Sequence, residues 1–200
     1  MPTPQSGKSV EGRRFHHYLE YEVTGDFSAS SICEIIEAAG NAEAFFAFGN
    51  DPWRKLSPNA PGALRDFEAI DGGADLKSPA TQYDLLLWFH AADYADVLDA
   101  ALSAQRVLDG TARLKLDVPG LVYRDSRDLT GFGDDSANPK EDARFKAALV
   151  PAGDAMPPDS HVSPTDVKLD DTALKIYRRS APFCGAREKG LYFNAFSCDP

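Results

Sequence analysis

The sequence has few cysteines and no long apolar run. Cys33, Cys184 and Cys198 are odd in number, and none belongs to a C-x-x-C pair. This favours a reduced, cytoplasmic chain with free thiols. The longest apolar runs, such as residues 35–40 and 85–89, are too short to span a bilayer. No apolar segment follows the polar N-terminus, so we expect no secretory signal.

Basic residues are also scarce relative to acidic ones. The chain has 21 Lys and Arg against 31 Asp and Glu, which gives a formal net charge of −10. Such an acidic surface repels phosphate backbones, so a nucleic-acid partner is not expected. The 43% of hydrophobic and 26% of charged residues are ordinary for a globular protein and exclude wholesale disorder. A chain of 200 residues can build one full core or two small ones.

The apolar pattern predicts four strands and two helices in the first part of the chain. The expected order is strand, helix, strand, strand, helix, strand, over residues 15–23, 28–39, 44–48, 82–90, 94–108 and 112–123. This is the order of a ferredoxin-like βαββαβ fold, and it predicts a first domain over residues 13–124. We expect a break in the last strand at Pro119, a flexible leader over residues 1–12 and a loop over residues 51–80.

The rest of the chain predicts a thinner second domain over residues 125–200. Residues 125–139 are rich in turn formers, and residues 140–150 fit a short helix or strand. Two further strands are expected, at residues 174–178 and 191–196. The predicted fold class is therefore α+β, with a ferredoxin-like first domain and a truncated second ferredoxin-like domain.

The four histidines differ in their predicted surroundings. His16 and His17 are neighbours in a strand, so their side chains point to opposite faces and do not form one metal site. His90 ends an apolar strand and is expected to be a satisfied histidine at a sheet edge. His161 stands in a proline-bounded loop, PPDSHVSP, and loops of this kind hold functional groups.

Two further polar groups could act with His161. Asp134 lies in the glycine-rich turn GFGDD, and Arg178 follows His161 by 17 positions at the end of a predicted strand. Two interpretations stay open on the residues alone. Either a cofactor is held between His161 and Arg178, or these are turn carboxylates and arginines that face water. Both tryptophans, Trp53 and Trp88, are expected in the core.

Several segments together resemble the dye-decolourising (DyP-type) haem peroxidases. The stretch RDLTGFGDDSANPKEDARFKAAL is similar to that family's signature, G-F-x-D-G followed closely by N-P. Downstream, SHVSPTDV and LKIYRRSAPF resemble its proximal-histidine loop and distal-arginine strand, and GLYFNAFSCDP resembles the strand that follows. Upstream, FGNDPWRKLS, LRDFEAI and SPATQYDLLLWFHA are similar to its N-terminal domain in matching order. The resemblance covers residues 13–200.

The resemblance implies two ferredoxin-like domains, haem b as cofactor, and reduction of hydrogen peroxide with a small organic molecule as electron donor. It implies that His161 binds the haem iron and that Asp134 and Arg178 are catalytic. An imidazole can hold the iron, a carboxylate can move a proton between peroxide oxygens, and a guanidinium can stabilise negative charge as the O–O bond breaks. Arg178, Ser180 and Phe193 are further implied cofactor-binding positions.

The chain also departs from the family pattern. His161 follows Asp134 by 27 positions, a much shorter segment than the family has there. The family also continues past the position of Pro200, and Asp135 replaces the closing glycine of the motif. We therefore expect weakened haem binding, and exposed strand edges that favour a homo-oligomer. Two alternatives remain: a haem-free oligomerisation module, or a porphyrin-binding module without peroxide turnover.

Overall fold

A computed structural model describes residues 4–59, 65–73, 76–127, 129, 138–148, 168–169, 172–173, 177–185 and 187–196. The chain divides into two compact units. The first unit comprises residues 4–60 and 64–119, and the second is built mainly from residues 120–200.

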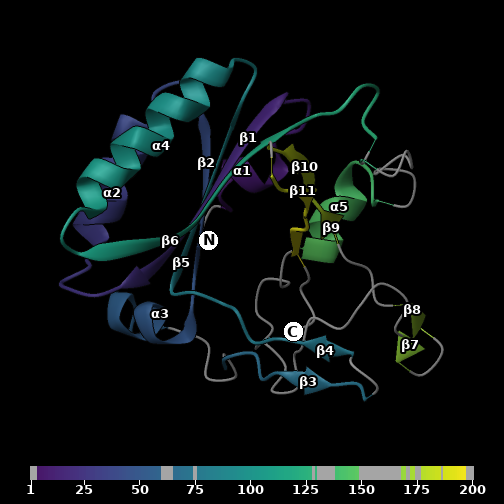
Figure 1. Ribbon diagram of the computed structural model, residues 1–200, viewed down its shortest axis with the longest axis horizontal. Helices are drawn as coiled ribbons and strands as arrows, with labels where there is room; N and C mark the ends of the chain where they lie inside the picture. The colour runs from purple at the N-terminus through teal and green to yellow at the C-terminus, as the bar shows by residue number, and fades with distance from the viewer. Residues whose placement is uncertain are drawn as a thin grey trace. The chain divides into compact units, whose positions relative to one another are not determined.

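The first unit contains a four-stranded sheet with two helices on one face (Figure 1). The strands are β1 (Phe15–Val23), β2 (Glu43–Phe48), β5 (Leu85–Ala91) and β6 (Ala112–Leu121). The helices are α2 (Ala29–Ala38) and α4 (Tyr94–Leu108). The strand order is β2-β5-β1-β6, and β5 pairs antiparallel with both β1 and β2. This confirms the predicted ferredoxin-like βαββαβ arrangement.

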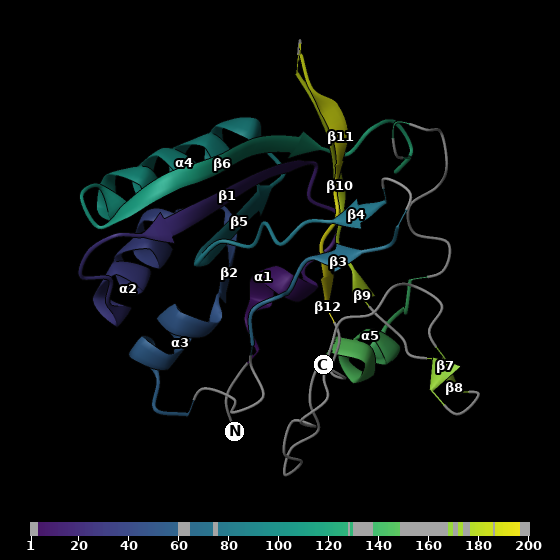
Figure 2. The same ribbon diagram turned by 60° about the horizontal axis from the view of Figure 1, so that its bottom comes forward.

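The main core lies between this sheet and the two helices, which run side by side in both ribbon views (Figures 1 and 2). The buried positions of α4 recur three and four residues apart, which places them on one helix face: Val97, Ala100, Ala101, Ala104 and Leu108. The Asp93 carboxylate accepts a hydrogen bond from the backbone N–H of Ala95 at 2.9 Å and so caps the helix start. On the sheet, Leu87 lies fully buried between Leu19 and Phe46.

The strand register places His16 and His17 on opposite faces, as predicted. His17 pairs with Phe89 on the helix-covered face, whereas His16 pairs with His90 on the other face. The prediction that His90 lies at a sheet edge was wrong, because β5 is an inner strand and His90 is fully buried. Its Nε2 lies 2.7 Å from the carbonyl oxygen of Gly7. A carbonyl only accepts, so His90 carries its proton on Nε2.

The N-terminal segment is not a flexible leader over its described residues, which begin at Pro4. It forms a short helix, α1 (Ser6–Ser9), in which Gly7 and Lys8 are buried. The Gln5 amide donates to the Phe46 carbonyl and accepts from the Phe46 N–H, both at 2.9 Å. Because β2 is an edge strand, these two bonds satisfy backbone groups that would otherwise face solvent.

We expect Gly7→Ala to detach α1 from the sheet. A Cβ at Gly7 would lie 2.2 Å from the carbonyl oxygen of Ala44, a backbone atom that cannot move aside cheaply. The expected loss of stability is about 1–3 kcal/mol, the usual effect of overpacking. Trypsin should then cleave faster after Lys8, which is 8% exposed in the wild type. Ser6→Ala, on the exposed side of the same helix, is the control, and equal cleavage rates in both variants would contradict this docking.

Two other expectations in this unit need correction. The predicted loop over residues 51–80 contains the helix α3 (Asn50–Leu56) and the hairpin strands β3 (Ile70–Asp71) and β4 (Lys77–Ser78). Pro52 is compatible with α3 because the N–H groups of the first helical turn have no partner within the helix. The strand β6 is not broken at Pro119, since an edge strand does not need every backbone donor.

The two tryptophans also differ from each other. Trp88 is fully buried, as predicted, but Trp53 is 36% exposed, so its assignment to the core was wrong.

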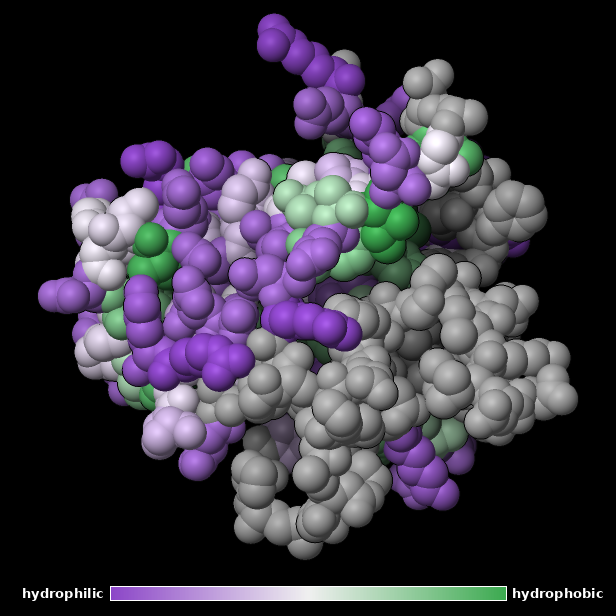
Figure 3. Space-filling model, turned by 90° about the horizontal axis from the view of Figure 1, so that it is seen from below, coloured by the Kyte–Doolittle hydropathy of each residue, from purple (hydrophilic) through white to green (hydrophobic). Residues whose placement is uncertain are grey.

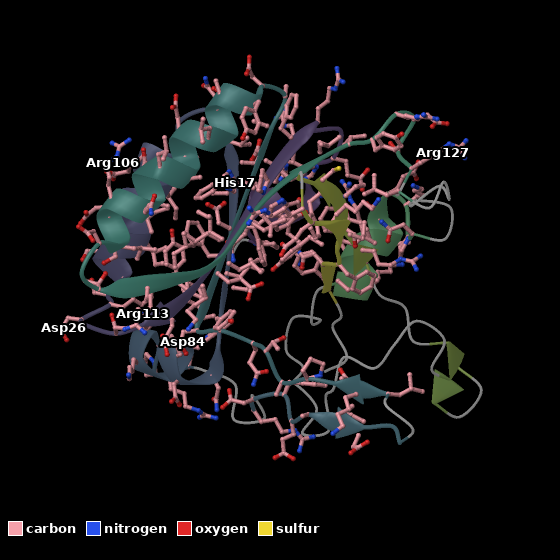
Figure 4. The ribbon with its side chains drawn as sticks, in the orientation of Figure 1. His17, Asp26, Asp84, Arg106, Arg113 and Arg127 are labelled. Carbon is pink, nitrogen blue, oxygen red and sulfur yellow. The ribbon has the colours of Figure 1, made fainter. Side chains whose placement is uncertain are left out.

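Strand β5 starts at Leu85 rather than at residue 82. The residue before it, Asp84, uses its side chain to accept a hydrogen bond from the Val23 N–H at 2.7 Å, and so links the start of β5 to the end of β1 (Figure 4).

Tyr21 carries a buried hydroxyl that has no hydrogen-bond partner in the described ranges. Burial and the nearby Asp117 carboxylate raise the pKa of Tyr21 to about 12. In the unfolded chain a tyrosine ionises near pH 10. The folded state therefore holds the Tyr21 proton more tightly, and this contribution to stability is complete below about pH 10 and is lost as the pH rises towards 12.

We expect Tyr21→Phe to unfold less readily at high pH than the wild type does. At neutral pH the variant should be as stable or more stable, since it loses only an unpaired buried hydroxyl. Urea denaturation at a series of pH values from 7 upwards measures both effects. Tyr83→Phe, at a tyrosine that is 37% exposed, serves as the control. An unchanged pH dependence in Tyr21→Phe would contradict the assignment.

The second unit contains one described helix, α5 (Asp142–Ala148), and three two-stranded sheets. The paired strands are β7 (Lys168–Leu169) with β8 (Thr172–Ala173), β9 (Tyr177–Arg178) with β12 (Ala195–Phe196), and β10 (Ala181–Cys184) with β11 (Lys189–Tyr192). The expected single strand over residues 191–196 is thus two strands, and β10 was missed. The expected domain boundaries and the truncation of this domain stay predictions.

One face of the described part of the chain is mostly polar (Figure 3). Figure 3 shows one face on which hydrophilic side chains cover most of the described part and hydrophobic ones form small groups. Within the described ranges, no helix has the length and apolar character needed to cross a membrane.

Candidate functional site

Three of the five predicted site residues are described. Arg178 ends β9, Ser180 follows it, and Phe193 lies between β11 and β12. Asp134 and His161 lie outside the described residues. The structure therefore brings Arg178, Ser180 and Phe193 into one small region of paired strands.

Asn138 fixes the backbone of Arg178. The Asn138 Nδ2 donates to the Arg178 carbonyl at 2.7 Å, and the Arg178 N–H donates to Asn138 Oδ1 at 2.8 Å. Asn138 is 7% exposed, so this pair of bonds is shielded from water. Sequence reasoning assigned no role to Asn138, although it is the asparagine of the N-P step in the quoted signature. The N-P step was therefore the sequence feature that could have indicated a role for Asn138.

The Arg178 side chain has a donor that the described part of the chain does not use. Its Nε is buried and has no hydrogen-bond partner among the residues that the structure describes. A buried donor without an acceptor is costly, and a guanidinium is suited to carboxylates and other oxygen anions. The position therefore fits a ligand that presents a negatively charged oxygen.

The neighbouring Arg179 is engaged within the protein. Its guanidinium lies 5.9 Å from the centre of the Tyr177 ring, and its Nη1 donates to the Tyr177 hydroxyl at 3.3 Å. Tyr177 is 1% exposed and its ring is 6.3 Å from that of Phe196. Thus two consecutive arginines have different environments, and Arg178 is the one with an unused buried donor.

Ser180 and Asn194 connect the strand ends around Arg178. The Ser180 hydroxyl accepts from Asn194 N–H at 3.2 Å, and the Asn194 carbonyl accepts from Arg179 N–H at 2.8 Å. Ser180 thus holds the backbone of the facing segment. The Nδ2 of Asn194 is another buried donor without a partner among the described residues. Phe193 beside it is 54% exposed and offers an apolar ring to a flat ligand.

Arg127 and Asp125 form a separate ion pair. Arg127 binds Asp125 through two hydrogen bonds of 2.7 and 2.9 Å at the surface (Figure 4). The hydrogen bond from Arg127 holds the pKa of Asp125 below its usual value. No group of three or more His, Cys, Asp or Glu side chains suited to a metal ion occurs among the residues that the structure describes.

The ferredoxin-like sheet defines an α+β protein, and the second unit contains an arginine whose buried Nε has no partner among the described residues. Two family models match the chain: "Dyp-type peroxidase, N-terminal" over residues 31–121 and "Dyp-type peroxidase, C-terminal" over residues 144–200. Together they cover more than half of its length. The chain belongs to the Dyp-type peroxidase family.

Individual relatives agree with this assignment. A dye-decolorizing peroxidase of Mycolicibacterium paratuberculosis is 26% identical over 90% of this chain and 66% of its own length. One from Rhodococcus erythropolis is 32% identical over 56% of this chain and 33% of its own length. The chain thus spans less than two thirds of either relative. A variant of DypB from Rhodococcus jostii, solved in complex with heme, has a TM-score of 0.76 at 22% identity and covers 96% of this chain and 82% of that one.

Proposed function

We propose that the protein is a haem-dependent peroxidase of the DyP type, which reduces hydrogen peroxide while it oxidises a small organic electron donor. The observation that carries the proposal is the buried Nε of Arg178, a cationic donor that has no partner among the described residues, in a chain of this family. It fits a site where a negatively charged oxygen binds or develops. The solved relative with heme supports haem as the group concerned, and haem b is the proposed form.

In this proposal bound haem supplies an iron centre that exchanges electrons with peroxide and with the donor. His161 holds the iron through its imidazole. Asp134 takes a proton from one peroxide oxygen and delivers it to the other. Arg178 donates to the oxygen that gains negative charge as the O–O bond breaks, and Asn138 keeps its backbone in place. Ser180 positions the strand ends, and Phe193 contacts the apolar part of the cofactor.

The remaining features of the proposal rest on the cysteine content, the expected strand edges and the order of the elements. The protein acts in the cytoplasm as a homo-oligomer, and its two domains comprise residues 13–124 and 125–200. Haem is held by residues of the second domain.

A hemin titration tests the assignment of His161. The Soret band should grow with the wild type and with Asp159→Ala, a control in the same loop, but saturate only at high hemin concentration, and it should not grow with His161→Ala. Tight saturation of the wild type would contradict the expected weakened haem binding. Equal binding by all three proteins would exclude His161 as the ligand. Absence of a Soret band in the wild type would favour the haem-free module, and a Soret band without peroxide consumption would favour the porphyrin-binding module.

A further inference from the structure

The sheet face of the first unit that is not covered by α2 and α4 carries a cluster of ring side chains. Its members are His16, Tyr18, Phe45, Trp88 and His90. Tyr18, Trp88 and His90 have no exposed surface. We call these five residues the ring cluster.

The rings of the cluster are in continuous contact around Trp88. The Trp88 ring centre is 4.4 Å from that of His90, 5.8 Å from that of His16 and 5.8 Å from that of Tyr18. The planes of these pairs are within 23° of parallel. Such stacked arrangements allow an electron vacancy to pass between neighbouring π systems. Apart from the sulfur-containing side chains, Trp and Tyr are the protein side chains that are most readily oxidised by one electron.

One hydrogen bond gives the cluster a proton acceptor as well. Trp88 Nε1 donates to His16 Nδ1 at 3.1 Å, and this bond is buried. An indole nitrogen only donates, so His16 Nδ1 is unprotonated and carries a lone pair towards Trp88. An indole that loses an electron becomes far more acidic at its nitrogen. The imidazole is therefore placed to take the Nε1 proton when the electron leaves.

We propose that Trp88 is an internal one-electron donor whose oxidation is coupled to proton transfer to His16. The indole loses one electron to an oxidant and its Nε1 proton to His16 Nδ1, which leaves a neutral indole radical and an imidazolium. An electron from the organic donor, together with return of the proton from His16 to Nε1, restores Trp88. In turnover this inference rests on the proposed function, since peroxide-oxidised haem would be the electron acceptor.

The second tryptophan provides a comparison within the same chain. Trp53 is 36% exposed and contacts the Phe48 ring edge-on at 5.8 Å. It has no described hydrogen bond from its indole to an imidazole. The chain has two tryptophans, so Trp53→Phe leaves Trp88 as the sole indole and Trp88→Phe leaves Trp53.

The decisive experiment uses an oxidant that needs no haem. Photogenerated tris(bipyridine)ruthenium(III) takes one electron from the full-length protein, and time-resolved absorption with electron paramagnetic resonance identifies the radical. We expect a neutral tryptophan radical in Trp53→Phe. Adding His16→Phe, which keeps a ring but removes the acceptor, should abolish it. Adding Tyr18→Phe instead should preserve it, because the hydrogen bond to His16 remains. Circular dichroism confirms that each variant is folded.

Two results would overturn the proposal: no tryptophan radical in folded Trp53→Phe, or an equal yield with and without His16. A second arm mixes the haem-loaded protein with hydrogen peroxide and freezes it, with indole-deuterated tryptophan to assign the signal. If haem does not load or peroxide is not consumed, the proposed function fails while the ruthenium arm still decides the role of Trp88. A peroxide-dependent radical that persists in Trp88→Phe would exclude Trp88 as the donor in turnover.

Discussion

Replacing Arg178 with alanine is expected to slow peroxide consumption by the haem-loaded protein roughly 10²–10³-fold, the usual effect of removing one donor to a developing oxyanion. The expectation depends on the buried Nε of Arg178, which has no hydrogen-bond partner in the described part of the chain. Iron ligation should persist, because the variant leaves His161 unchanged. Stopped-flow mixing with peroxide measures the rate, and the Soret band reports the haem.

Arg179→Ala is the matched control for this prediction. It removes the same charge one position away, but its guanidinium already contacts the Tyr177 ring and hydroxyl. We expect a near wild-type rate of peroxide activation, with some loss of stability from the missing contact. If both variants react with peroxide at the wild-type rate, Arg178 has no role in activation. Equal slowing of both would indicate a general charge effect instead.

Leu87→Ala is expected to lower the free energy of unfolding by about 2–5 kcal/mol, the range for a fully buried leucine. Leu87 has no exposed surface and lies on the middle strand pair, opposite Leu19 on β1 and Phe46 on β2. Neighbours on both sides belong to paired strands, so they cannot easily close the cavity left by the missing side chain. The substitution therefore removes apolar contacts that the neighbouring side chains cannot replace.

Urea denaturation followed by circular dichroism measures this loss. Leu86→Ala provides the control because Leu86 is half-buried, faces the other side of the sheet and pairs with Glu20 and Ala47. Its expected loss is smaller than that of Leu87→Ala. Equal losses in the two variants would show that the core does not lie on the helix-covered face. The slope of the free energy of unfolding against urea concentration should be similar for both variants if each unfolds in one step.

The elements of the first unit were predictable because each has a regular apolar period. Residues 15–23 and 94–108 have the same bounds in the sequence analysis and in the structure. The N-terminal helix was missed because its four residues, SGKS, carry no apolar period. It forms through tertiary contacts, since the Gln5 amide and the Gly7 backbone meet β2 and β5. Local patterns do not encode such contacts.

The candidate site could be predicted less well from local sequence patterns. Arg178 was singled out by its place at a predicted strand end 17 positions after His161, and the resemblance added its role and that of Ser180. The unused donor of Arg178 depends on burial, which the spacing of residues along the chain does not give. The role of Asn138 depends on bonds to a residue 40 positions away. Among the histidines, His90 could not be placed from its strand alone, because strand order decides which strand is internal.

The central place of β5 also sets an order of events during synthesis on the ribosome. Strand β2, with the sequence EAFFAF, has β5 as its strand partner, and β1 pairs with β5 over seven positions. Residues 49–84 must therefore be translated before this apolar segment finds its partner. Until then it is a short, aromatic, β-forming stretch in an unfinished chain, the kind of segment that associates with other nascent chains or with chaperones. Yield in cells should therefore depend on how quickly the ribosome reaches Ala91.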